Sequence, residues 1–162
     1  MPDGLENITI QRMTRDDIEE IARLEKLCFS DPWAKENFRE ELNHRFSVPL
    51  VVKSGQTIIG YICLWRIEDE MEIANFAVSP EFRRRGIGSK MMERVLWEAG
   101  ERGVTSLILS VRESNLPAIK LYTSYGFVEV YRRKKYYRQP TEDAVIMMKK
   151  LPANGKGQVS IV

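Results

Sequence analysis

Three arginines stand directly before a Gly-Ile-Gly turn in the segment RRRGIGSK, residues 83–90. An amphipathic helix pattern begins at that turn, so these positive charges gather where the helix dipole is already positive. The arrangement is unfavourable unless an anion occupies the turn. The backbone N–H groups of the first helical turn have no partner within the helix and can bind such an anion. The segment therefore predicts an anion-binding site.

Two familiar phosphate-binding motifs do not fit this segment. A P-loop ends in Gly-Lys-Ser or Gly-Lys-Thr, whereas here Lys90 follows Ser89, which excludes that motif. The dinucleotide-binding fingerprint needs three glycines and a suitably placed acidic residue; the segment has only Gly86 and Gly88, so the match is weak. What remains is the pattern Arg-x-x-Gly-x-Gly, which follows a strand-like run ending in FAVSPEF.

This pattern resembles the pyrophosphate-binding signature Gln/Arg-x-x-Gly-x-Gly/Ala of the GNAT superfamily of N-acetyltransferases. A second block, SVRESNLPAIKLYTSYGF at residues 110–127, is similar to a segment of RimI-type and other N-terminal acetyltransferases. In those enzymes the segment carries an Asn near the CoA arm and a Tyr near the thioester. The resemblance extends from about residue 8 to residue 151.

The resemblance implies acetyl-CoA as the cosubstrate, with its pyrophosphate as the anion in the turn, and it implies no metal. The residues implied to hold acetyl-CoA belong to a strand end, the arginine–glycine loop and the second block. They are Phe76, Ala77, Val78, Arg83, Arg84, Arg85, Gly86, Ile87, Gly88, Ser89, Asn115 and Tyr122. For Asn115, a role as a helix N-cap is an equally natural alternative.

Direct acetyl transfer needs a proton donor for the CoA thiolate and a base for the amine. The resemblance makes Tyr122 the donor, and a phenol with a pKa near 10 suits a thiolate of about 8.5 or above; simple packing on the sheet is the alternative. RimI-type enzymes have a glutamate where Ser110 stands, and serine is no comparable base. Glu72 matches the catalytic glutamate of histone lysine acetyltransferases, so we expect it to act through water. The alternatives are a merely solvated Glu72 and, less suited as a base, Glu113.

Two segments flank the acceptor in N-terminal acetyltransferases, and here they are CFSDPW at 28–33 and RRKKYYRQPTED at 132–143. The resemblance suggests that Phe29 and Trp33 hold the first acceptor side chain and that Tyr136 and Tyr137 bond the peptide backbone. Edge packing is the alternative for these aromatic residues.

The acceptor is expected to be a protein α-amine, with a ribosomal protein as one candidate. A terminal α-amine has a pKa near 8 and is about one-tenth neutral at pH 7, whereas a lysine must lose a proton at a cost of about 4.6 kcal/mol. A lysine or small-amine acetyltransferase of the same fold remains open because of Glu72. A non-catalytic acyl-CoA-binding module remains open because of Ser110.

Composition limits the class of protein. The 162 residues are 43% hydrophobic and 30% charged, which is typical of a single globular domain. A net charge of +2 does not argue for nucleic acid, and the basic run at 132–135 is expected to be a solvated strand end. Cys28, Cys63 and the single His44 exclude a disulfide framework and a conventional zinc cluster. Without a signal peptide or a membrane-length apolar run, we expect a cytoplasmic protein with no membrane partner.

The elements that position these residues are predicted to alternate between strands and helices. Strands are expected at 7–13, 48–54, 57–68, 71–79, 104–111, 126–138 and 143–151, and helices at 14–29, 34–46, 86–103 and 115–125. A crossover helix after Gly86 should make the central strands parallel. This predicts an α/β fold with a mixed sheet, the GNAT fold, in which the resemblance implies splayed central strands. Residues 1–151 should form one domain and residues 152–162 a loosely ordered tail.

Overall fold

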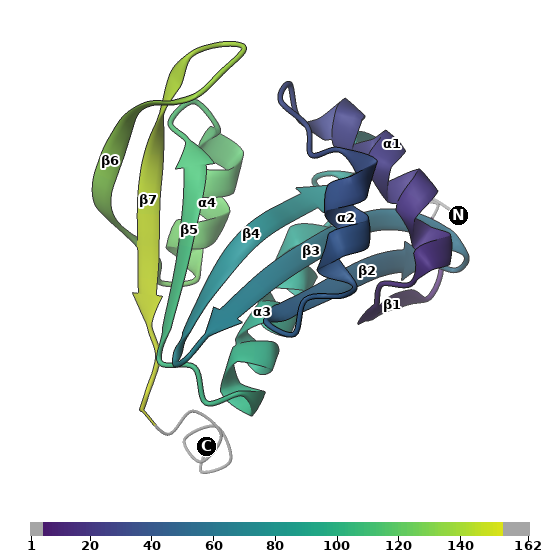
Figure 1. Ribbon diagram of the computed structural model, residues 1–162, viewed down its shortest axis with the longest axis horizontal. Helices are drawn as coiled ribbons and strands as arrows, with labels where there is room; N and C mark the ends of the chain where they lie inside the picture. The colour runs from purple at the N-terminus through teal and green to yellow at the C-terminus, as the bar shows by residue number, and fades with distance from the viewer. Residues whose placement is uncertain (1–4, 154–162) are drawn as a thin grey trace. The chain divides into compact units, whose positions relative to one another are not determined.

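The computed structural model describes residues 5–153, which contain four α-helices, two short 3-10 helices and seven strands (Figure 1). The elements are β1 (Ile8–Arg12), η1 (Arg15–Asp17), α1 (Ile18–Cys28), α2 (Lys35–Glu41), β2 (Ser47–Ser54), β3 (Thr57–Ile67), β4 (Glu70–Val78), η2 (Pro80–Phe82), α3 (Ile87–Glu101), β5 (Ser106–Arg112), α4 (Leu116–Ser124), β6 (Val128–Tyr137) and β7 (Glu142–Lys150). The strands form one sheet in the order β1-β2-β3-β4-β5-β7-β6. The predicted strands and helices are therefore confirmed in number and order.

The sheet is mixed, as predicted, with a parallel pair at its centre. Strands β4 and β5 are parallel, whereas β1 pairs antiparallel with β2, and β7 pairs antiparallel with both β5 and β6. The register between β4 and β5 runs from Glu70 opposite Ser106 to Ile73 opposite Leu109, which is only the first part of β4. This short register agrees with the expected divergence of the two central strands.

The described residues group into two compact units. The first unit comprises residues 5–64 and 75–91, and the second comprises residues 65–74 and 92–153. The single-domain organisation over 1–151 stays a prediction. Of the predicted tail at 152–162, all but Pro152 and Ala153 lie outside the described residues.

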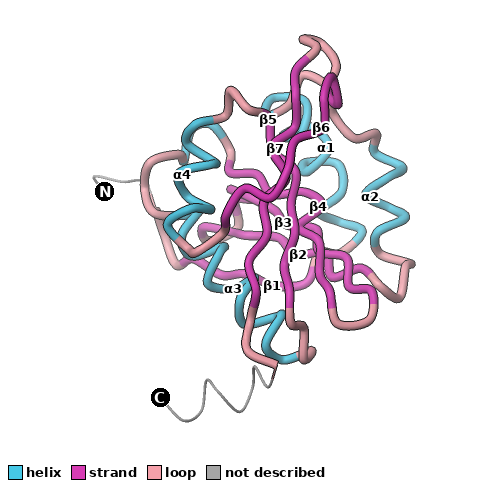
Figure 2. The backbone as a smooth tube through the Cα atoms, turned by 90° about the vertical axis from the view of Figure 1, so that its left-hand side faces the viewer, coloured by secondary structure: helices cyan, strands magenta, loops and turns pink. Residues whose placement is uncertain are grey.

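In the first unit, α1 and α2 lie side by side over β2 and β3 (Figures 1 and 2). Their buried side chains form a core with the sheet that includes Ile21 of α1, Phe38 of α2 and Tyr61 of β3. The rings of Phe38 and Tyr61 meet edge to face, with centroids 5.8 Å apart. The chain enters this layer through η1, where Thr14 is the N-cap and its backbone N–H donates to Asp17 Oδ2 at 2.9 Å.

Helix α2 is shorter than the sequence predicts. A helix was expected over 34–46, but α2 ends at Glu41. The Glu41 side chain is buried and accepts a hydrogen bond of 2.6 Å from Ser47 Oγ, which turns the chain directly into β2. The intervening Asn43, His44 and Arg45 are exposed, so this stretch has no apolar face to continue a packed helix.

In the second unit, α4 lies along β5 (Figures 1 and 2). The residue that follows α4, Tyr125, donates through its hydroxyl to Glu93 of α3 at 3.5 Å. Strands β6 and β7 form an antiparallel hairpin, but their register shifts twice, between Glu129 and Tyr131 and between Arg133 and Tyr137. These irregularities decide which side chains of β6 share a face.

Gly60 brings β3 into close contact with β4. A methyl group added at Gly60 would lie 2.8 Å from the Ala77 carbonyl oxygen and 3.3 Å from Met91 Sδ. Because the backbone carbonyl cannot yield without separating the strands, we expect Gly60→Ala to lower the free energy of unfolding by about 1–3 kcal/mol. Urea denaturation followed by circular dichroism measures this change.

The matched control for this prediction is Gly100→Ala in α3. Nothing lies within 4 Å of a methyl group added there, so removing a helical glycine should stabilise the fold by about 0.5–1 kcal/mol. A Gly60→Ala variant as stable as the unsubstituted protein would contradict the close contact between β3 and β4.

Candidate active site

The arginine–glycine loop, residues 83–89, belongs to the first unit and leads into α3. Its backbone adopts left-handed conformations at Arg84, with φ of 63°, and at Gly86, with φ of 81°. The Lys90 N–H donates to the Gly86 carbonyl at 3.2 Å, which is the first hydrogen bond of α3. Ile87 is buried and anchors the helix start. The N–H groups of residues 87–89 thus lie in the first helical turn, where an anion can bind.

The three arginines of this loop are exposed but differ in their contacts. The Arg83 Nε donates to the Val78 carbonyl at 3.0 Å, and Cys28 Sγ donates to the same oxygen at 3.6 Å. The Arg85 guanidinium lies over the Phe82 ring, 5.3 Å from its centroid. Arg83 therefore ties the loop to the end of β4. Direct contact of the arginines with phosphates stays a prediction.

The strand that precedes this loop carries the other predicted acetyl-CoA residues of the first unit. Exposure alternates along β4, so that Phe76 and Val78 lie on its half-buried face and Ala77 on its buried face. Glu72 lies on the same half-buried face as Phe76 and Val78, because alternate residues of a strand share a face.

Phe29 and Trp33 lie in the segment that joins α1 to α2, also in the first unit. Both are half-buried and pack against the core, and the Trp33 ring centroid is 5.3 Å from that of Phe38. The Trp33 backbone N–H donates to Glu25 Oε2 at 3.0 Å. The two aromatic residues are thus held on the core while part of each stays accessible.

Glu72 lies in the second unit. Partial burial raises the pKa of its carboxyl group above the usual value, the neighbouring Glu70 raises it further, and the Arg133 charge lowers it. Glu72 is registered with Ile108 of β5, so Ser110, two residues further along, lies on the same face. A carboxylate with a raised pKa is a stronger base, which suits the role expected of Glu72.

Arg133 was not singled out from the basic run at 132–135, yet it is the cation that acts on Glu72. Its guanidinium lies 5.8 Å from the ring centroids of both Tyr131 and Tyr136. Alternation along β6 could have placed Tyr131 and Arg133 on one face. The register shift in the part of β6 that contains Tyr136 could not be predicted from the sequence pattern. Within the same run, Arg132 pairs with Glu113 and Glu129 at 2.9 Å each.

Tyr122 lies on α4 and is 6% exposed, with its ring centroid 5.8 Å from that of Phe127. Burial raises the pKa of its phenol above the ordinary value near 10 that was assumed from the sequence, and the nearby Tyr137 raises it further. Tyr122 therefore holds its proton at neutral pH. At the start of α4, Asn115 Oδ1 accepts a bond of 3.3 Å from the Ala118 N–H, so the N-cap alternative for Asn115 is confirmed.

Tyr136 and Tyr137 end β6, and their rings meet edge to face with centroids 5.0 Å apart. The Arg112 guanidinium lies 4.7 Å from the centroid of the Tyr137 ring. It also donates to two backbone carbonyls of the β6–β7 turn, at 2.6 and 2.9 Å. Burial raises the pKa of Tyr137 to about 12. Arg112 thus holds the turn and its tyrosines against β5.

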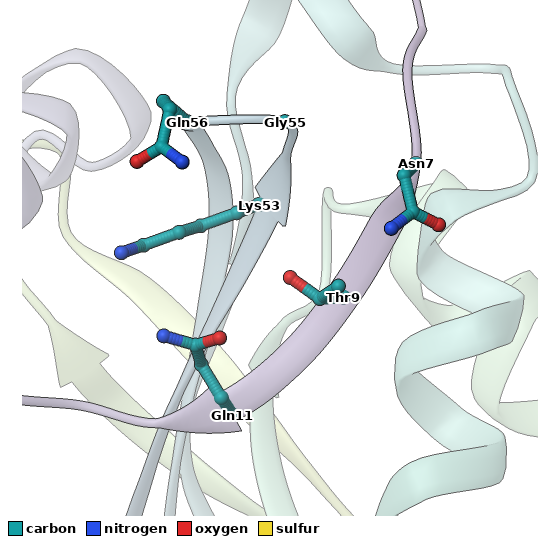
Figure 3. Close-up of a pocket in the computed structure, with 6 residues that line it drawn as sticks. All are labelled: Asn7, Thr9, Gln11, Lys53, Gly55 and Gln56. Atoms are coloured by element: carbon teal, nitrogen blue, oxygen red, sulfur yellow. The ribbon is translucent and has the colours of Figure 1, made fainter.

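A separate pocket of about 310 Å³ lies beside β1 in the first unit (Figure 3). It is lined by Asn7, Thr9, Gln11, Lys53, Gly55 and Gln56. Its charged side chain, Lys53, forms an ion pair with Asp17 at 3.3 Å. None of the predicted site residues belongs to this lining.

Two kinds of feature are absent from residues 5–153. No helix there is long and apolar enough to cross a membrane. In the same residues, no group of three or more His, Cys, Asp or Glu side chains is placed to hold a metal ion.

The chain is similar to known proteins over most of its length. The acetyltransferase (GNAT) family matches residues 18–127. The [ribosomal protein bS18]-alanine N-acetyltransferase of Salmonella typhimurium is 34% identical over 141 residues, which are 86% of this chain and 95% of that protein. N-alpha-acetyltransferase RimI of Mycobacterium tuberculosis is 34% identical over 148 residues, 88% of this chain and 92% of that protein.

A solved structure shows the same fold. The crystal structure of the ribosomal-protein-S18-alanine N-acetyltransferase from Escherichia coli matches with a TM-score of 0.83 at 29% identity. The match covers 89% of this chain and 94% of that one. The predicted mixed-sheet architecture is therefore confirmed by comparison as well as by topology.

Proposed function

Because the chain belongs to the acetyltransferase (GNAT) family, we propose that it transfers the acetyl group of acetyl-CoA to the N-terminal α-amine of a protein. The observation that carries this proposal is the loop of residues 83–89, whose left-handed turn at Gly86 leads into the first turn of α3. The names of the relatives support a protein α-amine as the acceptor. One relative is a ribosomal-protein alanine N-acetyltransferase, and the other is an N-alpha-acetyltransferase. A ribosomal protein is the acceptor that these names favour.

In this proposal, each residue that binds acetyl-CoA does so through a group that the structure describes. From the first unit, the N–H groups of residues 87–89 bind the pyrophosphate, the arginines add positive charge, and residues 76–78 of β4 bind the pantetheine arm. From the second unit, Asn115 bonds the arm through its amide nitrogen, because its oxygen already caps α4. Tyr122 acts at the sulfur.

The pyrophosphate role of the loop predicts that Gly86→Ala weakens CoA binding. Nothing lies within 4 Å of an added methyl group, so the penalty is the left-handed backbone itself, at φ of 81°. The exposed loop can relax when empty and must regain this conformation on binding. We expect the Kd for CoA to rise about 5- to 30-fold, because the left-handed conformation costs about 1–2 kcal/mol per residue. Isothermal titration calorimetry measures the Kd.

Gly103→Ala is the matched control for this substitution. Gly103 has φ of 68°, nothing within 4 Å of an added methyl group, and a place beyond α3 outside the predicted site. It carries the same backbone penalty, so stability should fall while the Kd for CoA stays within twofold. An equal loss of CoA affinity in both variants would argue against pyrophosphate binding by the loop.

The chemistry needs two proton transfers, and two side chains of the second unit are suited to them. The neutral amine attacks the thioester carbonyl carbon and the C–S bond breaks. The proton lost by the amine passes through water to Glu72, whose pKa is raised by burial. The departing thiolate takes a proton from Tyr122, whose pKa is raised by burial and which therefore keeps its proton until that step. Solvent restores both groups, leaving an amide and free CoA.

The test is acetyl transfer to a peptide library in which each peptide has a free N-terminus and one internal lysine. Mass spectrometry locates each acetyl group, and a second library with blocked N-termini serves as the control. Acetyl groups on α-amines alone, lost on blocking, support the proposal. Acetyl groups on lysine favour the lysine acetyltransferase, which is the second candidate because Glu72 is half-buried with a raised pKa. CoA binding without any product would overturn the enzyme assignment.

A further inference from the structure

A buried carboxylate in the first unit collects three hydrogen bonds that the chemistry above does not use. Glu25 of α1 is only 2% exposed. Its Oε1 accepts from the Tyr61 hydroxyl at 2.7 Å and from Asn75 Nδ2 at 3.0 Å. Its Oε2 accepts from the Trp33 backbone N–H at 3.0 Å. We refer to Glu25, Trp33, Tyr61 and Asn75 as the Glu25 cluster.

Burying such a group is unfavourable unless it is fully bonded. Burial raises the pKa of the Glu25 carboxyl group, whereas the three donors lower it. An apolar side chain would fill the same position at a smaller desolvation cost. Stability alone therefore does not explain the Glu25 cluster. The elements that contribute its members indicate a further role.

The partners come from three different elements of the first unit. Tyr61 lies on β3, and Asn75 lies on β4 directly before Phe76. The third donor is not a side chain but the backbone of the segment that joins α1 to α2. The Trp33 ring is fixed as well, because it packs on Phe38, which in turn meets the edge of the Tyr61 ring. Trp33 is thus held by its backbone through Glu25 and by its ring through Phe38.

We propose that Glu25 is a positioning residue for acceptor recognition: its carboxylate holds the Trp33 backbone, and with it the segment bearing Phe29 and Trp33, in the conformation that receives the acceptor. The inference rests on the proposed function and on the expectation from the sequence that these two aromatic residues hold the first acceptor side chain. In this proposal, Glu25 contacts neither acetyl-CoA nor the acceptor. It acts through the segment alone.

The substitution Glu25→Gln separates this role from stability. A glutamine has one carbonyl oxygen, which can keep the two donors of Tyr61 and Asn75, and one NH₂ group, which must then face the Trp33 N–H. Two donors facing each other cannot bond. In that arrangement the variant loses the bond to the Trp33 backbone N–H and keeps the two bonds to Tyr61 and Asn75.

Steady-state kinetics with a free-N-terminus acceptor peptide test the proposal. For Glu25→Gln we expect the KM for the peptide to rise about 10-fold, as for the loss of one hydrogen bond to a charged group. The KM for acetyl-CoA and kcat should stay within twofold. Amide hydrogen exchange at Trp33, followed by NMR, should become at least 10-fold faster in the same variant.

Two further variants serve as controls. Glu41→Gln changes another buried carboxylate of the first unit, which bonds Ser47 rather than the segment, so the KM for the peptide should not change. Glu25→Asp keeps the charge but withdraws the carboxylate by one methylene, and it too should raise the peptide KM. It provides the test if Glu25→Gln does not fold.

The outcomes distinguish this inference from the proposed function. Failure of the unsubstituted protein to acetylate any free N-terminus would overturn the proposed function and the acceptor role of Glu25 with it. Normal transfer by the unsubstituted protein together with an unchanged peptide KM in Glu25→Gln overturns the positioning role alone. Unchanged Trp33 exchange in that variant would do so as well. A loss of stability with no change in the peptide KM assigns the cluster to folding only.

Discussion

Replacing Tyr122 with Phe should lower kcat at least about 100-fold, the usual contribution of a positioned general acid. The expected cause is loss of the phenolic proton for the departing CoA thiolate. A thiolate leaving without a proton donor is a poor leaving group in a buried environment. The KM for acetyl-CoA should change little, because the aromatic ring and its packing are retained.

The packing around Tyr122 allows this substitution to remove the hydroxyl group alone. Tyr122 is buried, and its ring packs against Phe127, so a phenylalanine fills the same space. Because burial raises the pKa of Tyr122, the group stays protonated throughout the neutral range. Its ionisation should therefore cause no loss of activity between pH 7 and pH 9 in the unsubstituted protein.

Stopped or continuous assays of CoA release measure kcat, and Tyr125→Phe is the matched control. Tyr125 follows α4 directly, donates to Glu93 and is not among the predicted site residues, so loss of its hydroxyl should leave kcat within twofold. Full activity of Tyr122→Phe would remove this residue from the chemistry and leave water as the proton donor.

Replacing Glu72 with Gln should lower kcat/KM about 10- to 100-fold, at the lower end of general-base effects because a water molecule lies between base and amine. It should also remove the acidic limb of the pH–rate profile. A base acts only when deprotonated, and burial raises the pKa of Glu72 above its ordinary value of 4.5. Activity of the unsubstituted protein should therefore fall as the pH decreases through this raised pKa, a fall that occurs at higher pH than for a solvated glutamate.

The pH dependence can be tested with two neighbours that act on Glu72 in opposite directions. Arg133 lowers the pKa of Glu72, so Arg133→Ala should move the acidic limb to higher pH. Glu70 raises it, so Glu70→Gln should move the limb to lower pH. Profiles of kcat/KM for the three variants measure these shifts. An acidic limb that persists in Glu72→Gln would assign it to another group and exclude Glu72 as the base.

Much of the fold follows from local patterns in the sequence. Alternating or continuously apolar runs mark the strands, and the glycine at position 86 together with the Asn115 cap marks where α3 and α4 begin. The end of α2 did not follow, because it depends on Glu41 finding Ser47 in the folded chain. Local periodicity contains no information about such a contact.

The same distinction holds for the site. The arginine–glycine loop and Tyr122 each lie in a short sequence motif, and both could be predicted from it. The closeness of Arg133 to Glu72 arises from irregular pairing in β6 and could not be seen in an alternating pattern. Glu25 did leave a signal, since it lies four residues after Ile21 and three before Cys28, on the same helix face as these two apolar residues. A charge on that face was the available sign of a buried polar cluster.

Strand β6 also matters for how copies of the protein behave at high concentration. It is the last strand of the sheet order, and outer strands can pair with another chain and seed aggregation. Its two register shifts interrupt the regular row of backbone groups that a second strand would need. The four basic residues at 132–135 add charge repulsion between copies. The irregularity that brings Arg133 to Glu72 thus also protects this edge against association.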